Sequence, residues 1–165
     1  MARGHLAEHV GPVIVVAGDS PMLQRQSVAS LLDHFYGVRP ACLLGTLLKD
    51  EPRGLGRIVR DERGEFQGIV EEQDATLPQR QIQEVNMSTY VFDCRELLHA
   101  LDLLKNDNRQ GEFYLTDCPG ILRREGKLVQ ALPILQPCEA LSINTAEELA
   151  AVEREMAEFG YERAV

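Results

Sequence analysis

The feature that most constrains the fold is an uninterrupted apolar run, Val13-Ile14-Val15-Val16. Continuous apolar residues, in place of the alternation seen in a half-buried strand, are typical of a strand buried on both faces. Such strands lie inside α/β sheets that carry helices above and below. The run ends at Ala17-Gly18-Asp19-Ser20-Pro21, where glycine and proline interrupt regular structure. We therefore expect residues 13–17 to form an interior strand of such a sheet.

An amphipathic helix is expected next. Apolar residues recur at helical spacing from Leu23 to Phe35, which predicts a helix over about 24–35 that packs on the sheet. Gly37 is a suitable residue to end it. The apolar stretch over 41–48 then predicts a second strand, followed by a loop over 50–54 that contains proline and glycine.

The rest of the chain continues the alternation of strands and helices. Arg57–Arg60 and Phe66–Val70 flank a polar segment and predict a β-hairpin. Thr145 followed by Glu148 is a capping box, which predicts the start of a last helix. The other expected elements are a loop over 73–81, a strand over 84–92, helices over about 94–104 and 116–125, and short extended segments over 129–133 and 139–142. This order implies one α/β domain over residues 1–165, with a three-layer α/β/α arrangement around a mixed sheet.

Charge and composition exclude several classes of partner. The net charge is −9, which argues against nucleic acid or an anionic membrane surface as a general partner. No apolar stretch approaches the roughly 20 residues of a membrane helix, and the N-terminus lacks a signal-peptide pattern. The four cysteines are scattered without a C-x-x-C pair, as in proteins that keep reduced thiols. We expect a cytoplasmic protein.

Two polar residues follow apparent strand ends, where ligands gather in open α/β sheets. Asp19 comes just after the first apolar run, and an exposed carboxylate there suits a hard cation that substrate phosphates complete. Equally, Asp19-Ser20-Pro21 could turn the chain and cap the next helix. Asn144 directly precedes the last helix, where an anion could bind, although local turn and cap chemistry explains it as well.

Three other positions are candidates for binding a small molecule. Gly54-Leu55-Gly56 is too short for a dinucleotide fingerprint, and a loop that needs positive φ explains it equally well. Glu71 ends an expected strand and Asn86 lies within one. As lone polar residues, both are also consistent with a solvated or structural role.

Taken together, these motifs resemble a known family. The segments Ile69-Val70-Glu71-Glu72-Gln73-Asp74-Ala75-Thr76 and Gln81-Ile82-Gln83-Glu84-Val85-Asn86 carry most of the resemblance. Gly54-Leu55-Gly56-Arg57, Gln110-Gly111-Glu112-Phe113-Tyr114-Leu115-Thr116-Asp117 and Ser142-Ile143-Asn144-Thr145 add to it. Over about residues 13–156 the chain resembles the sugar-nucleotide pyrophosphorylases, nearest to bacterial N-acetylglucosamine-1-phosphate uridyltransferases. The resemblance implies a truncated nucleotide-diphospho-sugar transferase (Rossmann-like) fold, matching the C-terminal two-thirds of that domain.

The resemblance also implies roles for individual residues. Asp19 and Asn144 would jointly hold the Mg²⁺ that bridges the phosphates. The Gly56 backbone would bind the N-acetyl sugar, and Glu71 would accept hydrogen bonds from sugar hydroxyls. Asn86 would bind the sugar at its acetamido side. Tyr114 and Thr116 match residues near the sugar, and core packing is the other explanation for Tyr114.

Three departures from the family pattern bear on activity. Ala17 stands where the family usually has tyrosine, and Ser88 where it usually has glycine; both positions border the sugar pocket. No glycine-rich triphosphate loop with its arginine and lysine precedes residue 13. Because nucleotidyl transfer depends on positioning and charge neutralisation, we expect the isolated chain to be weak or inactive and its Mg²⁺ to bind weakly without phosphates. Three functions remain open: nucleotidyltransferase chemistry, a non-catalytic sugar-nucleotide-binding or assembly module, and a relic that binds nothing.

The family resemblance leads to an expectation about assembly. The strand that pairs beside residues 13–16 in the family has no counterpart in this sequence, and a bare apolar edge invites pairing with another chain. We expect a homodimer, or a partner, that covers the edge at residues 13–16, with the N-terminal arm 1–11 as a possible participant. The alternative is that this arm folds back and hides the edge.

Overall fold

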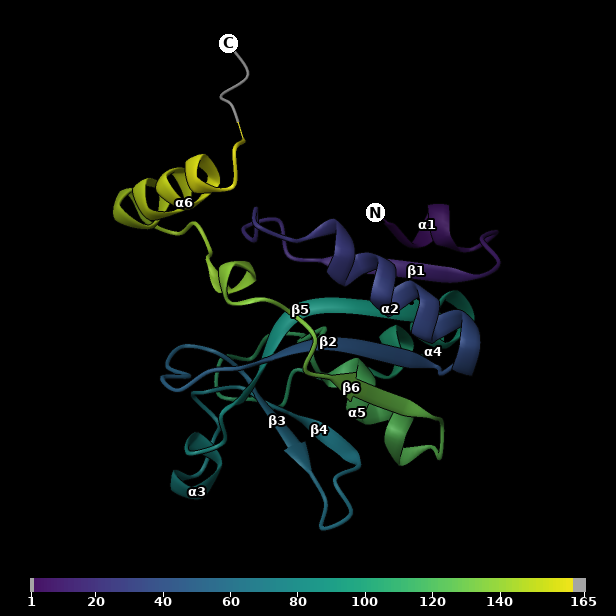
Figure 1. Cartoon of the computed structure of the whole chain (residues 1–165). Coiled ribbons are helices and arrows are strands. Elements are labelled where there is room, and N and C mark those ends of the chain that lie inside the picture. Colours follow the sequence, from purple (N-terminus) through teal and green to yellow (C-terminus); the bar gives the residue numbers. More distant parts are fainter. Residues whose placement is uncertain (1, 162–165) are drawn as a thin grey trace.

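The structure is a computed structural model and describes residues 2–161, which form an α/β domain around a six-stranded mixed sheet (Figure 1). The longest strand, β5, lies at the centre of the sheet. β2 pairs along one edge of β5, while β1 and β3 pair with different parts of its other edge. β6 runs parallel to β2, and every other pairing is antiparallel. The strands are β1 (Pro12–Val16), β2 (Cys42–Leu48), β3 (Arg57–Arg60), β4 (Phe66–Val70), β5 (Glu84–Asp93) and β6 (Val129–Leu132).

Helices cover both faces of the sheet, which confirms the predicted three layers. On one face Leu31 and Phe35 of α2 pack against Leu43 and Val91. On the other face helices α4 and α5 pack against a larger core. Neighbouring residues of one strand point to opposite faces, so β2 and β5 serve both cores. The helices are α1 (Ala2–Leu6), α2 (Arg25–Val38), α3 (Leu77–Arg80), α4 (Cys94–Leu103), α5 (Asp117–Arg124) and α6 (Ala146–Glu158). None of them, within residues 2–161, is long and apolar enough to cross a membrane.

The last helix begins where the capping box predicts. The Glu148 N–H donates to Thr145 Oγ1 at 3.2 Å, and the Thr145 N–H donates to Glu148 Oε2 at 3.0 Å. Val152 of this helix is buried against Met22 and Cys138 in a small separate core. These contacts attach α6 beside the loop that follows β1, away from the centre of the sheet (Figure 1).

The prediction that residues 13–17 form a strand buried on both faces is wrong, whereas the bare edge expected at residues 13–16 is present in the described part of the chain. β1 is an edge strand in the part of the chain that the structure describes, because β5 is the only strand that pairs with it. Val13 and Val15 pack against the core, whereas Ile14 and Val16 are 41% and 44% exposed. The reason is coverage: α2 packs over β2 and β5 and leaves this face of β1 open.

Two turns differ from the sequence predictions. Helix α2 continues through Gly37 and ends where Arg39 adopts a left-handed backbone, with φ of 54° and its N–H donating to Phe35 O at 2.7 Å. The next residue, Pro40, cannot continue the helix. The expected loop 73–81 contains the short helix α3, since a proline in the first helical turn loses no hydrogen bond.

The segment before α6 also departs from prediction. Residues 139–142 are not extended throughout, because Pro137–Ala140 form a turn of 3-10 helix. The carboxylate of buried Glu139 accepts hydrogen bonds from Gln24 N at 2.9 Å and Ser27 Oγ at 2.7 Å. Glu139 therefore supports the start of α2, so Asp19-Ser20-Pro21 does not cap that helix, although it does turn the chain, with the Ser20 N–H donating to Ala17 O at 3.4 Å.

Candidate functional site

A cavity of about 430 Å³ opens between the turn after β4 and the segment before α5. Glu71 lies in its wall, and Glu71 Oε1 accepts a hydrogen bond from Thr116 Oγ1 at 2.8 Å. Two segments 45 residues apart in sequence thus meet through two of the predicted site residues. The lining residues are Gly54, Glu71, Glu72, Gln73, Gln110, Phe113, Tyr114, Leu115 and Thr116.

Gly56 is packed directly between Glu71 and Asn86. A Cβ atom at position 56 would lie 3.0 Å from Ile69 Cγ2 and 3.3 Å from Glu71 Oε2, so glycine is the residue that fits. The carbonyl oxygen of Gly56 accepts the Asn86 N–H at 2.8 Å. Gly56, Glu71, Asn86 and Thr116 therefore form one contiguous group, which we call the glycine–glutamate cluster.

The side-chain amide of Asn86 has a fixed orientation. Asn86 Oδ1 accepts from Tyr90 Oη at 3.0 Å and from the Ser88 N–H at 3.3 Å. Burial raises the pKa of Tyr90, so its hydroxyl remains a donor at neutral pH. Because the oxygen is already bonded, the amide NH₂ is the part of Asn86 left to donate to an oxygen acceptor; Asn86 itself is 6% exposed and is not among the residues that line the cavity.

A bulge in β5 produces this arrangement. Gly45 of β2 is opposite Thr89 and the next residue, Thr46, is opposite Asn86, so Met87 and Ser88 have no partner on β2. Ser88 has a φ of 50°, a left-handed conformation that glycine adopts more easily. Bulges re-aim side chains, and at this one the Ser88 N–H reaches back to Asn86 Oδ1.

Sequence reasoning missed two charged residues beside the cluster. The Arg57 side chain is 2% exposed, and its Nη2 donates to Glu72 Oε2 at 3.0 Å. This hydrogen bond lowers the pKa of Glu72, which therefore stays ionised. Both residues lie in segments that carry the family resemblance, Arg57 directly after Gly56 and Glu72 directly after Glu71, but nothing in the sequence indicates that they pair.

The two predicted metal ligands lie on adjacent segments. The Ile143 N–H donates to the backbone oxygen of Asp19 at 3.0 Å, which brings the loop after β1 beside the residues that precede α6. Asn144 Nδ2 donates to Ser142 Oγ at 3.2 Å, so the Asn144 carboxamide oxygen is left for another partner. Both residues are exposed. A carboxylate oxygen and an amide oxygen are both ligands that Mg²⁺ binds. They suit a cation that takes its other ligands from phosphates and water.

A second cavity, of about 380 Å³, lies next to Asn144, and Asp19 is not among its lining residues. Asn144, Ser142 and Arg53 are among its lining residues, together with Gly54. Gly54 also lines the cavity at Glu71. The loop around Gly54 therefore separates the Asn144 side from the glycine–glutamate cluster. Within residues 2–161 no group of three or more His, Cys, Asp or Glu side chains could hold a metal ion, so the Asp19–Asn144 site remains a prediction.

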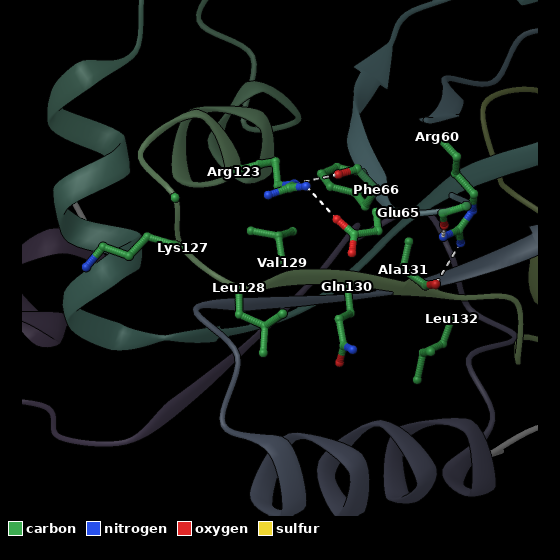
Figure 2. Close-up of a pocket in the computed structure, with 12 residues that line it drawn as sticks. Arg60, Glu65, Phe66, Arg123, Lys127, Leu128, Val129, Gln130, Ala131 and Leu132 are labelled. Carbon is green, nitrogen blue, oxygen red and sulfur yellow. Dashed lines mark hydrogen bonds and ion pairs between the residues drawn. The ribbon is translucent and has the colours of Figure 1, made fainter. Parts of the chain in front are cut away.

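A third cavity, of about 490 Å³, lies between β6 and the β3–β4 hairpin (Figure 2). Its basic residues already have acidic partners: Arg60 with Glu84, Arg123 with Glu65, and Lys127 with Glu96, at 2.6, 2.8 and 2.7 Å. Figure 2 shows the Arg123 side chain directed at Glu65 and Phe66 across this gap. With these cations paired, the cavity offers no unpaired charge to an anionic ligand.

Comparison with known proteins identifies relatives of this chain. No family model matches it. The bifunctional protein GlmU of Geobacillus sp. (strain WCH70) is 38% identical over 157 residues, which are 95% of this chain and 34% of that protein. GlmU of Streptococcus thermophilus (strain ATCC BAA-491 / LMD-9) is 39% identical over 93% of this chain and 33% of its own length. The chain therefore spans about one third of the length of these relatives.

Solved structures share the fold. A protein provisionally named a glucose-1-phosphate thymidylyltransferase, from Bacillus anthracis, superposes with a TM-score of 0.72 over 98% of this chain and 60% of its own chain, at 12% identity. The structure of apo UDP-glucose pyrophosphorylase gives a TM-score of 0.62 over 96% of this chain and 58% of its own, also at 12% identity. The α/β fold with its mixed sheet is thus that of nucleotidyltransferase structures.

Proposed function

We propose that this chain, which is homologous to GlmU proteins and has a nucleotidyltransferase fold, supplies the sugar- and Mg²⁺-binding portion of a sugar-nucleotide pyrophosphorylase. It would correspond to the C-terminal two-thirds of such a domain. In the reaction, a phosphate oxygen of N-acetylglucosamine-1-phosphate attacks the α-phosphorus of UTP, and the bond from that phosphorus to the β-phosphate oxygen breaks. UDP-N-acetylglucosamine forms and pyrophosphate leaves. No covalent enzyme intermediate is required.

The glycine–glutamate cluster is the observation that carries the proposal. Its Glu71 carboxylate accepts from Thr116 through Oε1, which leaves Oε2 beside Gly56 for a sugar hydroxyl. The NH₂ of Asn86 would donate to the acetamido oxygen. A sugar requires such a mixture of donors and acceptors on a concave wall. The acidic net charge gives no support for a nucleic-acid partner.

The proposed cation would bind at Asp19 and Asn144. When bound, Mg²⁺ would neutralise phosphate charge as the α-phosphate is attacked. The protein's part is positional: the backbone bond between Ile143 and Asp19 holds the two ligands on adjacent segments. Four free, buried cysteines are consistent with a reducing compartment, so the proposal includes a cytoplasmic location.

The second candidate function is a non-catalytic sugar-nucleotide-binding or assembly module. The observation that favours assembly is the open edge of β1, where Ile14 and Val16 are exposed beside an unpaired strand edge in the described part of the chain. We propose that a second copy of this chain pairs along β1. Helix α1 leaves that edge open because it packs on α4, where Arg3 and Asp102 form an ion pair.

Calorimetric titration with UDP-N-acetylglucosamine, with and without Mg²⁺, tests the proposal. We expect saturable binding that Mg²⁺ strengthens and that Glu71→Gln weakens about tenfold, as expected for a hydrogen bond to a charged group. Glu65→Gln is the matched control, because Glu65 pairs with Arg123 at the third cavity and should leave binding unchanged. No binding at millimolar ligand would contradict the proposal.

A parallel assay of pyrophosphate release from UTP and N-acetylglucosamine-1-phosphate tests whether this chain is catalytic on its own. The 165-residue polypeptide contains no glycine-rich triphosphate loop, so we expect turnover far below the roughly 1–10³ per second of typical enzymes. Turnover within that range would show that this chain carries the complete chemistry and would rule out the non-catalytic candidate.

A further inference from the structure

We propose that Arg57 is a positioning residue of the cavity at Glu71, and that it acts through Glu72 and the loop at residues 54–56. The identity of the ligand rests on the proposed function. The ion pair of Arg57 with Glu72 and its bonds to the loop at residues 54–56, which we call the clamp, rest only on contacts within the chain.

One buried guanidinium joins three separate segments. Arg57 begins β3, and its Nη1 donates to Leu55 O in the loop before that strand. Its Nη2 donates to Glu72 Oε2 at 3.0 Å, in the turn after β4, and approaches Arg80 O at the end of α3 at 3.5 Å. The loop at residues 54–56 is also attached to β5 by the Asn86 N–H bond to Gly56 O, but Arg57 is the residue that links it to both Glu72 and the end of α3.

Glu72 connects this guanidinium to the cavity wall. Its Oε2 also accepts the Gly54 N–H at 2.7 Å, and both Glu72 and Gly54 line the cavity. The Glu72 side chain is 32% exposed, whereas that of Arg57 is 2% exposed, so the arginine lies behind the wall and the glutamate in it. The backbone on both sides of Gly56, and the turn that carries Glu71, are thereby held by one ion pair.

The burial of Arg57 is hard to explain by stability alone. Its Nε is buried without a hydrogen-bond partner, and within residues 2–161 no other buried side-chain nitrogen or oxygen lacks one. A buried charge with an unmet donor is costly, and apolar residues often replace buried ion pairs without loss of stability. Retention of arginine here therefore points to a need for geometry, which a planar group with several donors supplies.

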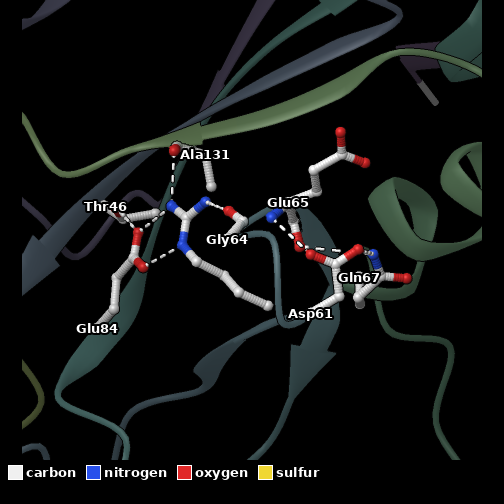
Figure 3. A network of polar contacts seen from close by, with 8 residues as sticks. Thr46, Asp61, Gly64, Glu65, Gln67, Glu84 and Ala131 are labelled. Atoms are coloured by element: carbon white, nitrogen blue, oxygen red, sulfur yellow. Dashed lines mark hydrogen bonds and ion pairs between the residues drawn. The ribbon is translucent and has the colours of Figure 1, made fainter.

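Arg60 provides a matched control on the same strand. It too pairs with a glutamate: Arg60 Nε and Nη2 donate to Glu84 at 2.6 and 2.7 Å, and Nη2 also donates to Ala131 O at 2.7 Å. Figure 3 shows Glu84, Thr46, Gly64 and Ala131 gathered around that guanidinium. This network joins the hairpin to β5 and β6, and Arg60 lines the third cavity and not the one at Glu71.

The test compares Arg57→Lys with Arg60→Lys. Lysine keeps the charge but cannot reach three acceptors at once. We expect Arg57→Lys to raise the Kd for UDP-N-acetylglucosamine by about tenfold or more, the usual effect of losing a group that orients a binding residue. Arg60→Lys should lower the denaturation midpoint and change Kd less than twofold, measured where both variants are fully folded. Equal effects of the two variants on Kd would overturn the proposal.

The exchange rates of backbone amide hydrogens test the clamp in the absence of any ligand. The Gly54 N–H donates to Glu72 and the Asn86 N–H donates to Gly56. Both amides should exchange faster in Arg57→Lys and in the milder variant Glu72→Gln than in Arg60→Lys, when the variants are compared at equal free energy of unfolding. If the unaltered chain binds no sugar nucleotide but these amides respond, the proposed function fails and the clamp stands. Unchanged exchange in both clamp variants would overturn the clamp.

Discussion

Ser88 holds a backbone conformation that costs an L-residue energy. Its φ of 50° lies in the left-handed region, where the Cβ atom crowds the following carbonyl. The bulge that requires it also sets the position of Asn86, so the strain is located at the candidate site. Strained residues persist where the surrounding structure determines them, and often at functional sites.

Ser88→Gly should therefore stabilise the chain. Relief of about 1–2 kcal/mol of left-handed strain exceeds the roughly 0.5–1 kcal/mol entropy cost of glycine, so we expect a net gain of up to about 1 kcal/mol. Urea denaturation measures it as a higher midpoint with an unchanged slope. Ser88→Ala is the control, because it keeps the Cβ atom and should not be stabilised. A lower midpoint for Ser88→Gly would show that the serine hydroxyl outweighs the strain.

At the scale of elements, the sequence predicts the helices and strands whose positions depend on neighbouring residues alone. The hairpin strands β3 and β4 and the Thr145 capping box occur where turn and cap residues predicted them. The burial of β1 was mispredicted, because burial depends on which helix covers a strand, and the apolar run does not contain that information. The short helix α3 departs from the prediction of a loop, because a proline, which usually signals a loop, is tolerated in a first helical turn.

The open edge of β1 leads to a prediction about assembly. A strand edge with exposed Ile14 and Val16 favours pairing with the same edge of a second copy, so light scattering at tens of micromolar should give about twice the 18.5 kDa of one chain. Ile14→Lys places a charge on that edge and should yield a monomer. Leu77→Lys removes an equally apolar exposed residue on α3 and should remain dimeric. A monomeric unaltered chain would contradict the pairing.

At the scale of the whole molecule, the candidate site depends on how distant segments meet. Family resemblance selected Gly56, Glu71, Asn86 and Thr116, and the fold brings all four together. The contacts of Arg57 and Tyr90 could not be predicted in this way, because they are buried contacts that form only once the chain has folded. Asp19 and Asn144 lie on adjacent segments, and their joint binding of a cation remains a prediction.

The central claim is that the glycine–glutamate cluster binds a sugar nucleotide. Two-dimensional ¹H–¹⁵N NMR of the labelled chain during titration with UDP-N-acetylglucosamine and Mg²⁺ tests it most directly. We predict the largest shifts at the backbone amides of Gly56 and Thr116 and at the side-chain NH₂ of Asn86. Gln130, in the third cavity, should not move. Shifts confined to the third cavity, or none at saturating ligand, would contradict the claim.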